Sequence, residues 1–419
     1  MAKLGVTRLA AMMFFTVSGG PYGLEEMISG LGWRAALAAV LIVPLIWALP
    51  TALLTAELAA EKPSQSGYYA WVRDALGERA GAMAAWISLA MSVFDMAIYP
   101  AMAIAYLAKI IPALADPATG WFTSAALIFF GAAASLFGSS IVSAFSVASA
   151  VALLLPFALM IKPAFTSSVT ADASAATVMS AGLLCMWNYM GWDNSSTLSA
   201  DVRCPQKTYP RALALALALV TLSYAGATLI ASRYYGVTSM STGSWVDVAA
   251  HMCGAWAGIA VALCGAVCGF NMFCALVSSY AQLPAAMARD GLLPSIFAKT
   301  TRRGAPYVSI AVTCCAYAVS SGAGIKRLME LDVLLYGALF AMQAAALLKL
   351  SKIRTLKRAA RLCYVCGVPI CLLLTAVWVG RRELGMWSLS SAELGGIIIA
   401  ICAIAAFATS SARRSSSRD

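Results

Sequence analysis

The residues best suited to chemistry are carboxylates inside or beside long apolar stretches. Glu25 and Glu26 follow a short glycine-rich segment, Asp95 stands in an otherwise uncharged stretch, and Asp193 lies in a polar and aromatic block. A carboxylate at the centre of a bilayer costs about 2.5–3.5 kcal/mol on insertion scales, so such residues are functional candidates. Because these stretches hold almost no Lys or Arg, we expect the carboxylates to attract a cation or a proton rather than an anion.

Most of these acids also have a structural alternative. Glu25 and Glu26 would complement the dipole of a helix that begins there, and Asp193 is a favoured residue type at a helix N-cap. Glu57 stands near the predicted inner end of a span, where solvent or basic loop residues would pair with it. The sequence leaves open which of Glu25, Glu26 and Glu57 would carry a proton.

Asp95 has the weakest structural explanation, because neither a cap nor an interface accounts for it. Tyr99 follows one helical turn later on the same face, where it could hydrogen-bond Asp95 or share a ligand with it. Further aromatic residues gather near the other acids, namely Tyr22, Trp187, Tyr189 and Trp192. Aromatic faces stabilise ammonium groups by about 0.5–2 kcal/mol each. Core packing is the alternative, and it is weakest for Trp187 and Trp192, so we favour an amine-containing ligand.

Transmembrane helices are the elements that must position these residues. Only 11% of the 419 residues are charged and 61% are hydrophobic, whereas an ordinary soluble domain carries about 25% charged residues. Uncharged stretches repeatedly reach the roughly 20 residues that a span needs. We predict an all-α polytopic membrane protein with about twelve spans, near residues 8–32, 35–58, 81–108, 121–137, 140–161, 175–200, 212–235, 253–285, 305–323, 331–349, 362–380 and 394–411.

Two of the predicted spans are interrupted. Residues 18–23 (Ser-Gly-Gly-Pro-Tyr-Gly) combine a proline, which removes a backbone donor, with three glycines, which lower helix propensity. Residues 187–196 place polar and aromatic side chains in the middle of the sixth span. Irregular backbone at membrane depth is tolerated only where it is buried in protein or lines a watery cavity. Interruptions in the first and sixth spans are typical of transporters built from inverted repeats.

Basic residues indicate the orientation. With the N-terminus placed inside, most of the 29 Lys and Arg residues fall on the inner side, and cytoplasmic loops favour Lys and Arg. We expect one transmembrane domain at residues 1–411, a cytoplasmic Ser/Arg-rich tail at 412–419, and both termini cytoplasmic in the cell membrane. The net charge of +11 is then a topology signal that gives no support to nucleic-acid binding. With no catalytic set or cofactor motif evident, we expect no enzyme, no cofactor and no metal.

Several segments carry a family resemblance. They are residues 15–26 (Phe-Thr-Val-Ser-Gly-Gly-Pro-Tyr-Gly-Leu-Glu-Glu), residues 55–58 with 67–72, residues 95–100, residues 187–213 and residues 288–294. Together they resemble the amino acid–polyamine–organocation superfamily, and most closely its polyamine:proton symporter family, which includes plant and protozoan polyamine uptake transporters. The sequence departs from that pattern at Ser66, where a glycine is expected, and at residues 96–98.

The resemblance implies a five-plus-five inverted repeat with broken helices 1 and 6, two additional helices, and coupling to protons. It implies a substrate between spans one, three, six and eight. The expected substrate-binding residues in this sequence are Ser18, Gly19, Gly20, Tyr22, Gly23, Glu25, Asp95, Tyr99, Trp187, Tyr189, Trp192 and Asp193. The proton-coupling candidates are Glu25, Glu26 and Glu57.

The leading prediction is therefore a proton-coupled secondary transporter, embedded in a lipid bilayer, for polyamines or related organic cations. An amino-acid permease for cationic or neutral amino acids, on the same fold, is the main alternative. A channel or a sensor that does not transport is a third class. A channel would favour a continuous polar pore over two opposed helix breaks.

Overall fold

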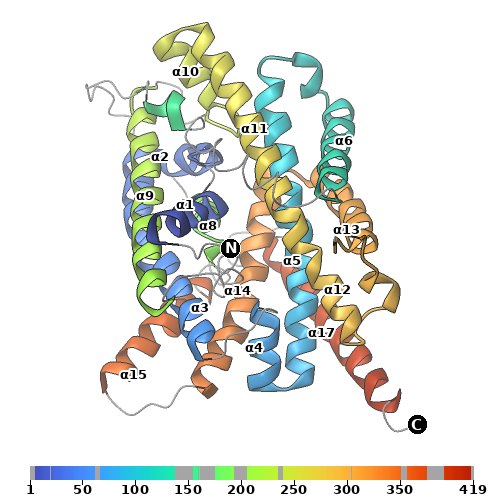
Figure 1. Cartoon of the computed structure of the whole chain (residues 1–419). Coiled ribbons are helices and arrows are strands. Elements are labelled where there is room, and N and C mark those ends of the chain that lie inside the picture. Colours follow the sequence, from blue (N-terminus) through green and yellow to red (C-terminus); the bar gives the residue numbers. More distant parts are fainter. Residues whose placement is uncertain are drawn as a thin grey trace.

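The computed structural model of the chain is a bundle of helices (Figure 1). It describes residues 5–18, 20–61, 67–136, 154–158, 160, 175–192, 205–234, 239–302, 304–350, 356–374 and 391–416. Regular structure within these ranges is helical throughout, and six of the helices are long and apolar enough to cross a membrane. Large apolar side chains such as Leu222 and Val319, 69% and 74% exposed, face outward, where lipid would cover them. The predicted all-α membrane fold is confirmed.

The first two predicted spans form one nearly continuous run of helix after the first break. The chain begins with α1 (Val6–Val17) and resumes with α2 (Glu25–Val43), which passes through a π-helical turn at Pro44–Ala48 into α3 (Leu49–Glu61). Gly32 interrupts α2 with a φ of +70°, a conformation that favours glycine. This kink separates the end of the first span from the second, close to the predicted boundary between residues 32 and 35.

The remaining helices follow the predicted spans, with short helices between some of them. They are α4 (Gly67–Leu76), α5 (Glu78–Ala108), α6 (Pro117–Leu136), α8 (Ala175–Trp187), α9 (Pro205–Ala231), α10 (Trp245–Cys253), α11 (Ala255–Tyr280), α12 (Gln282–Arg289), α13 (Tyr307–Ser320), α14 (Ile325–Leu350), α15 (Leu356–Leu362) and α17 (Ser391–Ser416). The predicted fifth span falls largely on residues outside the described ranges. Helix α17 extends beyond its predicted span into the segment assigned to a tail.

The helices separate into two groups that each combine both halves of the chain. Helices α1 and α2 pack with α8 and α9, whereas α5 and α6 pack with α11 and α13 (Figure 1). In span order, the first and second spans therefore associate with the sixth and seventh, and the third and fourth with the eighth and ninth. An offset of five is the pairing that a five-plus-five repeat predicts. Helix α14 lies between the groups and contacts both α5 and α8.

Both predicted helix breaks are confirmed. Helix α1 ends at Val17 and α2 begins at Glu25, and Gly20 between them has a φ of +117°. Helix α8 ends at Trp187, and Gly191 beyond it has a φ of +94°. Glycine adopts such positive φ values without the steric cost that a Cβ imposes. The remainder of the sixth span, from residue 193 to 204, lies outside the described residues.

Small residues allow α11 to approach α5 closely. A Cβ added at Gly269 would stand 2.4 Å from the carbonyl oxygen of Tyr99, and one added at Gly265 would stand 2.4 Å from the ring of Tyr106. Gly265 and Gly269 are one turn apart on α11, which is the small-residue spacing that lets helix backbones meet in a membrane. This contact fixes the height and rotation of α5, the helix that carries Asp95.

We predict that Gly269→Ala lowers the free energy of unfolding by about 1–3 kcal/mol, because the added methyl group has to push the α5 backbone away. Gly226→Ala on α9 is the matched control, since nothing lies within 4 Å of a Cβ built there. That control should be neutral or stabilising by up to about 1 kcal/mol through helix propensity. Denaturant unfolding of the purified protein in detergent measures both. Equal effects of the two substitutions would contradict the close α5–α11 contact.

Candidate functional site

Side chains from distant helices satisfy the backbone carbonyls that the first break leaves without helical partners. The indole Nε1 of Trp245, at the start of α10, donates to the carbonyl oxygen of Pro21 at 3.0 Å. The Asn188 amide donates to the carbonyl oxygen of Gly23 at 3.4 Å. Buried backbone groups need such partners, because an unmade hydrogen bond at membrane depth costs several kcal/mol. The second contact also joins the two breaks directly, since Asn188 belongs to the second.

The second break is satisfied in the same way. Trp47 donates through Nε1 to the carbonyl oxygen of Met186 at 3.1 Å, and the Tyr224 hydroxyl donates to the carbonyl oxygen of Asn188 at 2.9 Å. The Asn188 amide also bonds the carbonyl oxygen of Leu184, one turn earlier, at 2.8 Å. All four side chains that donate to the two breaks, from Trp47, Asn188, Tyr224 and Trp245, are buried. The irregular backbone is thus held inside the protein and is kept away from lipid.

A cavity of about 40 Å³ lies beside the two breaks, between the two groups of helices. A water molecule needs roughly 10–15 Å³ in the same measure, so the cavity has room for about three water-sized molecules. The lining residues are polar, aromatic or sulfur-containing for the most part: Val17, Ser18, Tyr22, Met91, Asp95, Tyr99, Met102, Trp187, Asn188, Met190, Gly191, Cys268, Met272, Tyr280, Asp332 and Tyr336. Among these described lining residues, two are carboxylates and none is Lys, Arg or His.

Asp95 is held in the cavity wall by two tyrosine hydroxyls. Tyr99 donates to Oδ1 at 2.9 Å, as the spacing on α5 predicts, and Tyr280 at the end of α11 donates to Oδ2 at 2.8 Å. A carboxylate offers about four lone-pair sites, so each oxygen of Asp95 can accept a further donor from a ligand. The Tyr99 ring also lies 6.3 Å from that of Trp187, which places an aromatic face from each group of helices in the same wall.

The structure adds residues that sequence reasoning missed. Tyr280 contacts Asp95 across 185 residues of chain, and nothing local in the sequence signals that contact. Asp332 and Tyr336 come from α14, near the predicted outer end of the tenth span. A carboxylate at that position is expected to lie at the membrane–water interface. Their spacing repeats that of Asp95 and Tyr99, and this repeated Asp-x-x-x-Tyr pattern was the available signal.

The predicted binding residues divide into three sets. Ser18, Tyr22, Asp95, Tyr99 and Trp187 line the cavity. The second set is buried but does not line it, and consists of Gly20, Gly23, Glu25, Tyr189 and Trp192. Within that set, Tyr189 donates to the carbonyl oxygen of Val40 at 2.9 Å, and Trp192 donates to that of Tyr189 at 2.8 Å, so both polar groups support backbone. Gly19 and Asp193 lie outside the described residues.

Glu25 is completely buried and joins three parts of the fold. Its Oε2 accepts the N–H of Gly23 at 2.8 Å, across the end of the first break. Its Oε1 accepts the N–H of Gly243 at 3.0 Å, in the turn before α10, and the hydroxyl of Tyr106 on α5. Among the residues that the structure describes, no basic side chain forms an ion pair with Glu25. Three hydrogen-bond donors thus stabilise the charged carboxylate.

The two other proton-coupling candidates have different surroundings. Glu26 is partly exposed and accepts a hydrogen bond from the hydroxyl of Thr242 at 3.1 Å. Glu57 lies 2.5 Å from Nε of Arg361, which follows α14 in the chain and belongs to α15. The expected pairing of Glu57 with a basic loop residue is therefore present. Of the three candidates, Glu25 alone is fully buried and connects separate helices through its carboxylate.

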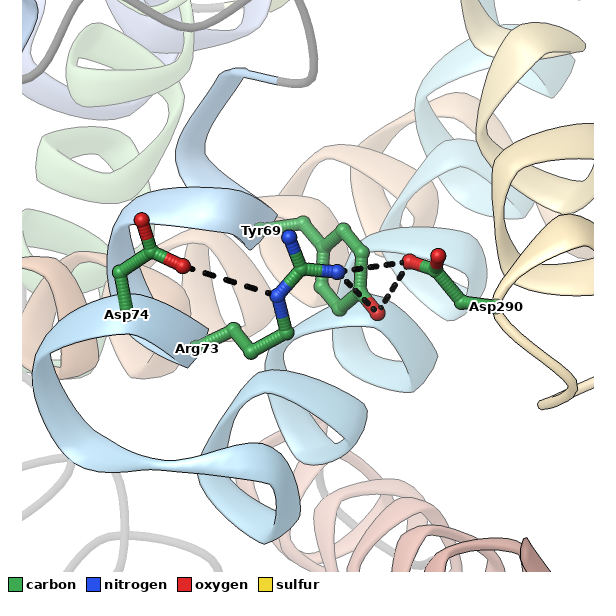
Figure 2. A network of polar contacts seen from close by, with 4 residues as sticks. All are labelled: Tyr69, Arg73, Asp74 and Asp290. Atoms are coloured by element: carbon green, nitrogen blue, oxygen red, sulfur yellow. Dashed lines mark hydrogen bonds and ion pairs between the residues drawn. The ribbon is translucent and has the colours of Figure 1, made fainter. Parts of the chain in front are cut away.

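A second polar network joins α4 to the residue after α12, at the end of the bundle away from α10 (Figures 1 and 2). Tyr69 donates to Oδ2 of Asp290 at 2.7 Å, and Nη1 of Arg73 donates to the same oxygen at 2.9 Å. The guanidinium also lies over the Tyr69 ring, 5.1 Å from its centroid. Burial and the neighbouring carboxylate raise the pKa of Tyr69 to about 12, so its hydroxyl stays a donor at neutral pH.

We predict that a double-mutant cycle of Arg73→Gln and Asp290→Asn gives a coupling energy of up to about 1 kcal/mol, the range of partly exposed ion pairs. The matched control is the cycle of Arg73→Gln with Asp74→Asn, whose contact is 3.7 Å long and more exposed. The control should give a smaller coupling. Unfolding midpoints in detergent at low salt supply the four values for each cycle. A larger coupling for Asp74 would mean that α4 is not held by Asp290.

Comparisons with known proteins match almost the whole chain. The sequence model of a family described as amino acid permease matches residues 4–416. The polyamine transporter RMV1 of Arabidopsis thaliana is 31% identical over 349 residues, which cover 80% of this chain and 70% of the relative. The polyamine transporter PUT1 of Oryza sativa subsp. japonica is 31% identical over 340 residues, covering 78% of this chain and 63% of the relative.

Proposed function

The chain belongs to the amino acid permease family, and from that premise we propose that it is a proton-coupled secondary transporter for polyamines or related organic cations. One observation carries the choice of substrate. Asp95 faces a buried cavity lined by Tyr99, Tyr280 and Trp187, and none of the described lining residues is basic. Carboxylates and aromatic faces together bind an ammonium group, and they repel an anion. The similarity to plant polyamine transporters supports the same substrate class.

An amino-acid substrate is the second candidate, because the family description names it. The carboxylate of an amino acid would need free N–H groups at a helix break. At the first break, however, the N–H of Gly20 is bonded to Oγ of Ser18 at 3.1 Å, and that of Gly23 is bonded to Glu25. The negative charge of Glu25 lies beside those groups. These contacts favour a cation without a carboxylate.

The protein is an integral membrane protein, and we place its termini in the cytoplasm and the protein in the cell membrane. Helices α4 and α15, which carry Arg73 and Arg361, lie at the end of the bundle that the C-terminal end of α17 also approaches, away from α10 (Figure 1). Most basic loop residues belong to that side of the predicted topology, and cytoplasmic loops favour Lys and Arg. Helix α10 would then lie on the outer side. We propose that the protein transports its substrate and does not act as an enzyme. We also propose a single transmembrane domain at residues 1–411, followed by a cytoplasmic tail at 412–419.

We assign proton coupling to Glu25. Its carboxylate ties the first break to Tyr106 on α5 and to Gly243 before α10, so opening the α10 side requires these contacts to separate. A protonated acid carries a proton of its own and accepts fewer hydrogen bonds, so proton binding weakens this connection. A proton is therefore taken up while the outer side is open. It is released when closure brings the three donors back to the carboxylate.

We predict that Asp95→Asn weakens polyamine binding while leaving the shape of the cavity unchanged. Losing a charge-assisted hydrogen bond costs about 1.5–3 kcal/mol, which corresponds to a ten- to hundredfold lower affinity. Uptake of labelled diamine into proteoliposomes, measured over a range of concentrations, gives the apparent affinity. A neutral amino acid, if it is carried at all, should be affected less. Normal expression with unchanged diamine affinity would make Asp95 a structural residue and remove the main support for a cationic substrate.

We predict that Glu25→Gln abolishes accumulation driven by a proton gradient while exchange of labelled for unlabelled substrate continues. A difference of 1 pH unit is worth about 1.4 kcal/mol per proton, enough for about tenfold accumulation with one coupled proton. In vesicles with a clamped membrane potential, the unaltered protein should reach that ratio and Glu25→Gln should only equilibrate. Glu26→Gln is the neighbouring control and should stay coupled. Uptake that follows a sodium gradient and ignores the proton gradient would overturn the assignment.

A further inference from the structure

A second carboxylate, Asp332, lines the same cavity as Asp95. Its side chain is 1% exposed, and it comes from α14, the helix that contacts both groups of the bundle. Asp95 comes from α5, so the two acids approach the cavity from different helices. Tyr336 stands one turn after Asp332 and also lines the cavity, just as Tyr99 follows Asp95. The cavity thus has two carboxylate and tyrosine pairs, each from its own helix.

Two carboxylates in one buried cavity repel each other, and the repulsion is strong where water is scarce. None of the described lining residues is Lys, Arg or His. A ligand with one positive charge would balance the negative charge of one carboxylate and leave the charge of the other unbalanced. A ligand with a positive charge at each end would compensate both, which is the condition under which buried charges are tolerated. The charge pattern of the cavity therefore matches a dication better than a monocation.

Flexible apolar side chains also line the cavity. Met91, Met102 and Met272 line the cavity together with the two acids. Methionine is unbranched and adapts its shape to irregular apolar surfaces. Such a wall suits the methylene chain that joins two amines. The cavity of about 40 Å³ has to widen to take that chain, and methionine side chains can move without displacing backbone.

We propose that Asp332 is the second anionic anchor of the binding cavity and selects ligands that carry two ammonium groups. Asp95 binds one ammonium and Asp332 binds the other, and the methylene chain contacts methionine side chains of the same cavity. This assignment rests on the proposed transport of organic cations and deepens it. It makes Asp332 a determinant of specificity, distinct from Glu25, which contacts Tyr106 and Gly243 outside the cavity lining.

The test compares diamines with a monoamine in Asp332→Asn. Uptake of labelled butane-1,4-diamine into proteoliposomes is measured with propane-1,3-diamine, pentane-1,5-diamine and butylamine as competitors. We expect Asp332→Asn to raise the half-saturating concentration of the diamine about ten- to hundredfold, the effect of one lost charge-assisted contact. Inhibition by butylamine should change less than about threefold, because one amine needs only Asp95. The control is Asp247→Asn, an exposed acid on α10 paired with Lys109, which should change neither value.

Asp332→Glu supplies the second variant, and it keeps the charge in case Asp332→Asn fails to fold. Its carboxylate reaches one methylene further into the cavity, so we expect it to keep the preference for diamines but to favour a shorter one. Equal loss of diamine and monoamine in Asp332→Asn, or an unchanged chain-length preference in Asp332→Glu, would overturn the assignment. An unaltered protein that carries no organic cation would instead refute the proposed function, so the two failures are distinguishable.

Discussion

Backbone groups that lose their helical partners at membrane depth have to be satisfied by the protein itself, and this constraint organises the whole structure. The two breaks are held by donors from other helices, among them Trp47, Tyr224 and Trp245. Each donor fixes the position of its helix relative to a break. Asn188 goes further, because it bonds a carbonyl of the first break while its own carbonyl accepts from Tyr224. The breaks are therefore a junction at which distant helices meet.

The same constraint separates acids that look alike in the sequence. Glu25 follows a break and has three donors, two of them backbone N–H groups, so its charge is used within the protein. Asp95 lies within α5, and its partners are two side-chain hydroxyls. Accepting from Tyr99 and Tyr280 orients the carboxylate and still leaves it lone pairs for a ligand. The two acids thus differ in their partners: Glu25 bonds mainly backbone N–H groups, whereas Asp95 bonds side-chain hydroxyls at the cavity.

Local patterns predicted the spans, the breaks and the hydrogen bond between Tyr99 and Asp95, because hydropathy, glycine and proline content, and helical spacing act within one segment. Contacts between helices could not be predicted in that way. Tyr280 bonds Asp95 from the end of α11, a helix that also approaches α5 closely at Gly269. Asp332 was missed because a carboxylate near the end of a predicted span is expected to lie at the membrane–water interface. Tyr189, in the second break, was expected to face the substrate. In the structure its hydroxyl donates to the backbone carbonyl of Val40.

Helix α5 connects the cavity with Glu25, the buried acid beside the first break. Tyr99 and Tyr106 are seven residues apart and therefore lie on the same face of the helix. The first hydroxyl bonds Asp95 in the cavity wall, and the second bonds Glu25. Close packing of Gly265 and Gly269 against these same turns keeps that stretch of α5 rigid against α11. A displacement of this stretch of α5 would therefore change the surroundings of both carboxylates, because Tyr99 and Tyr106 belong to the same helix.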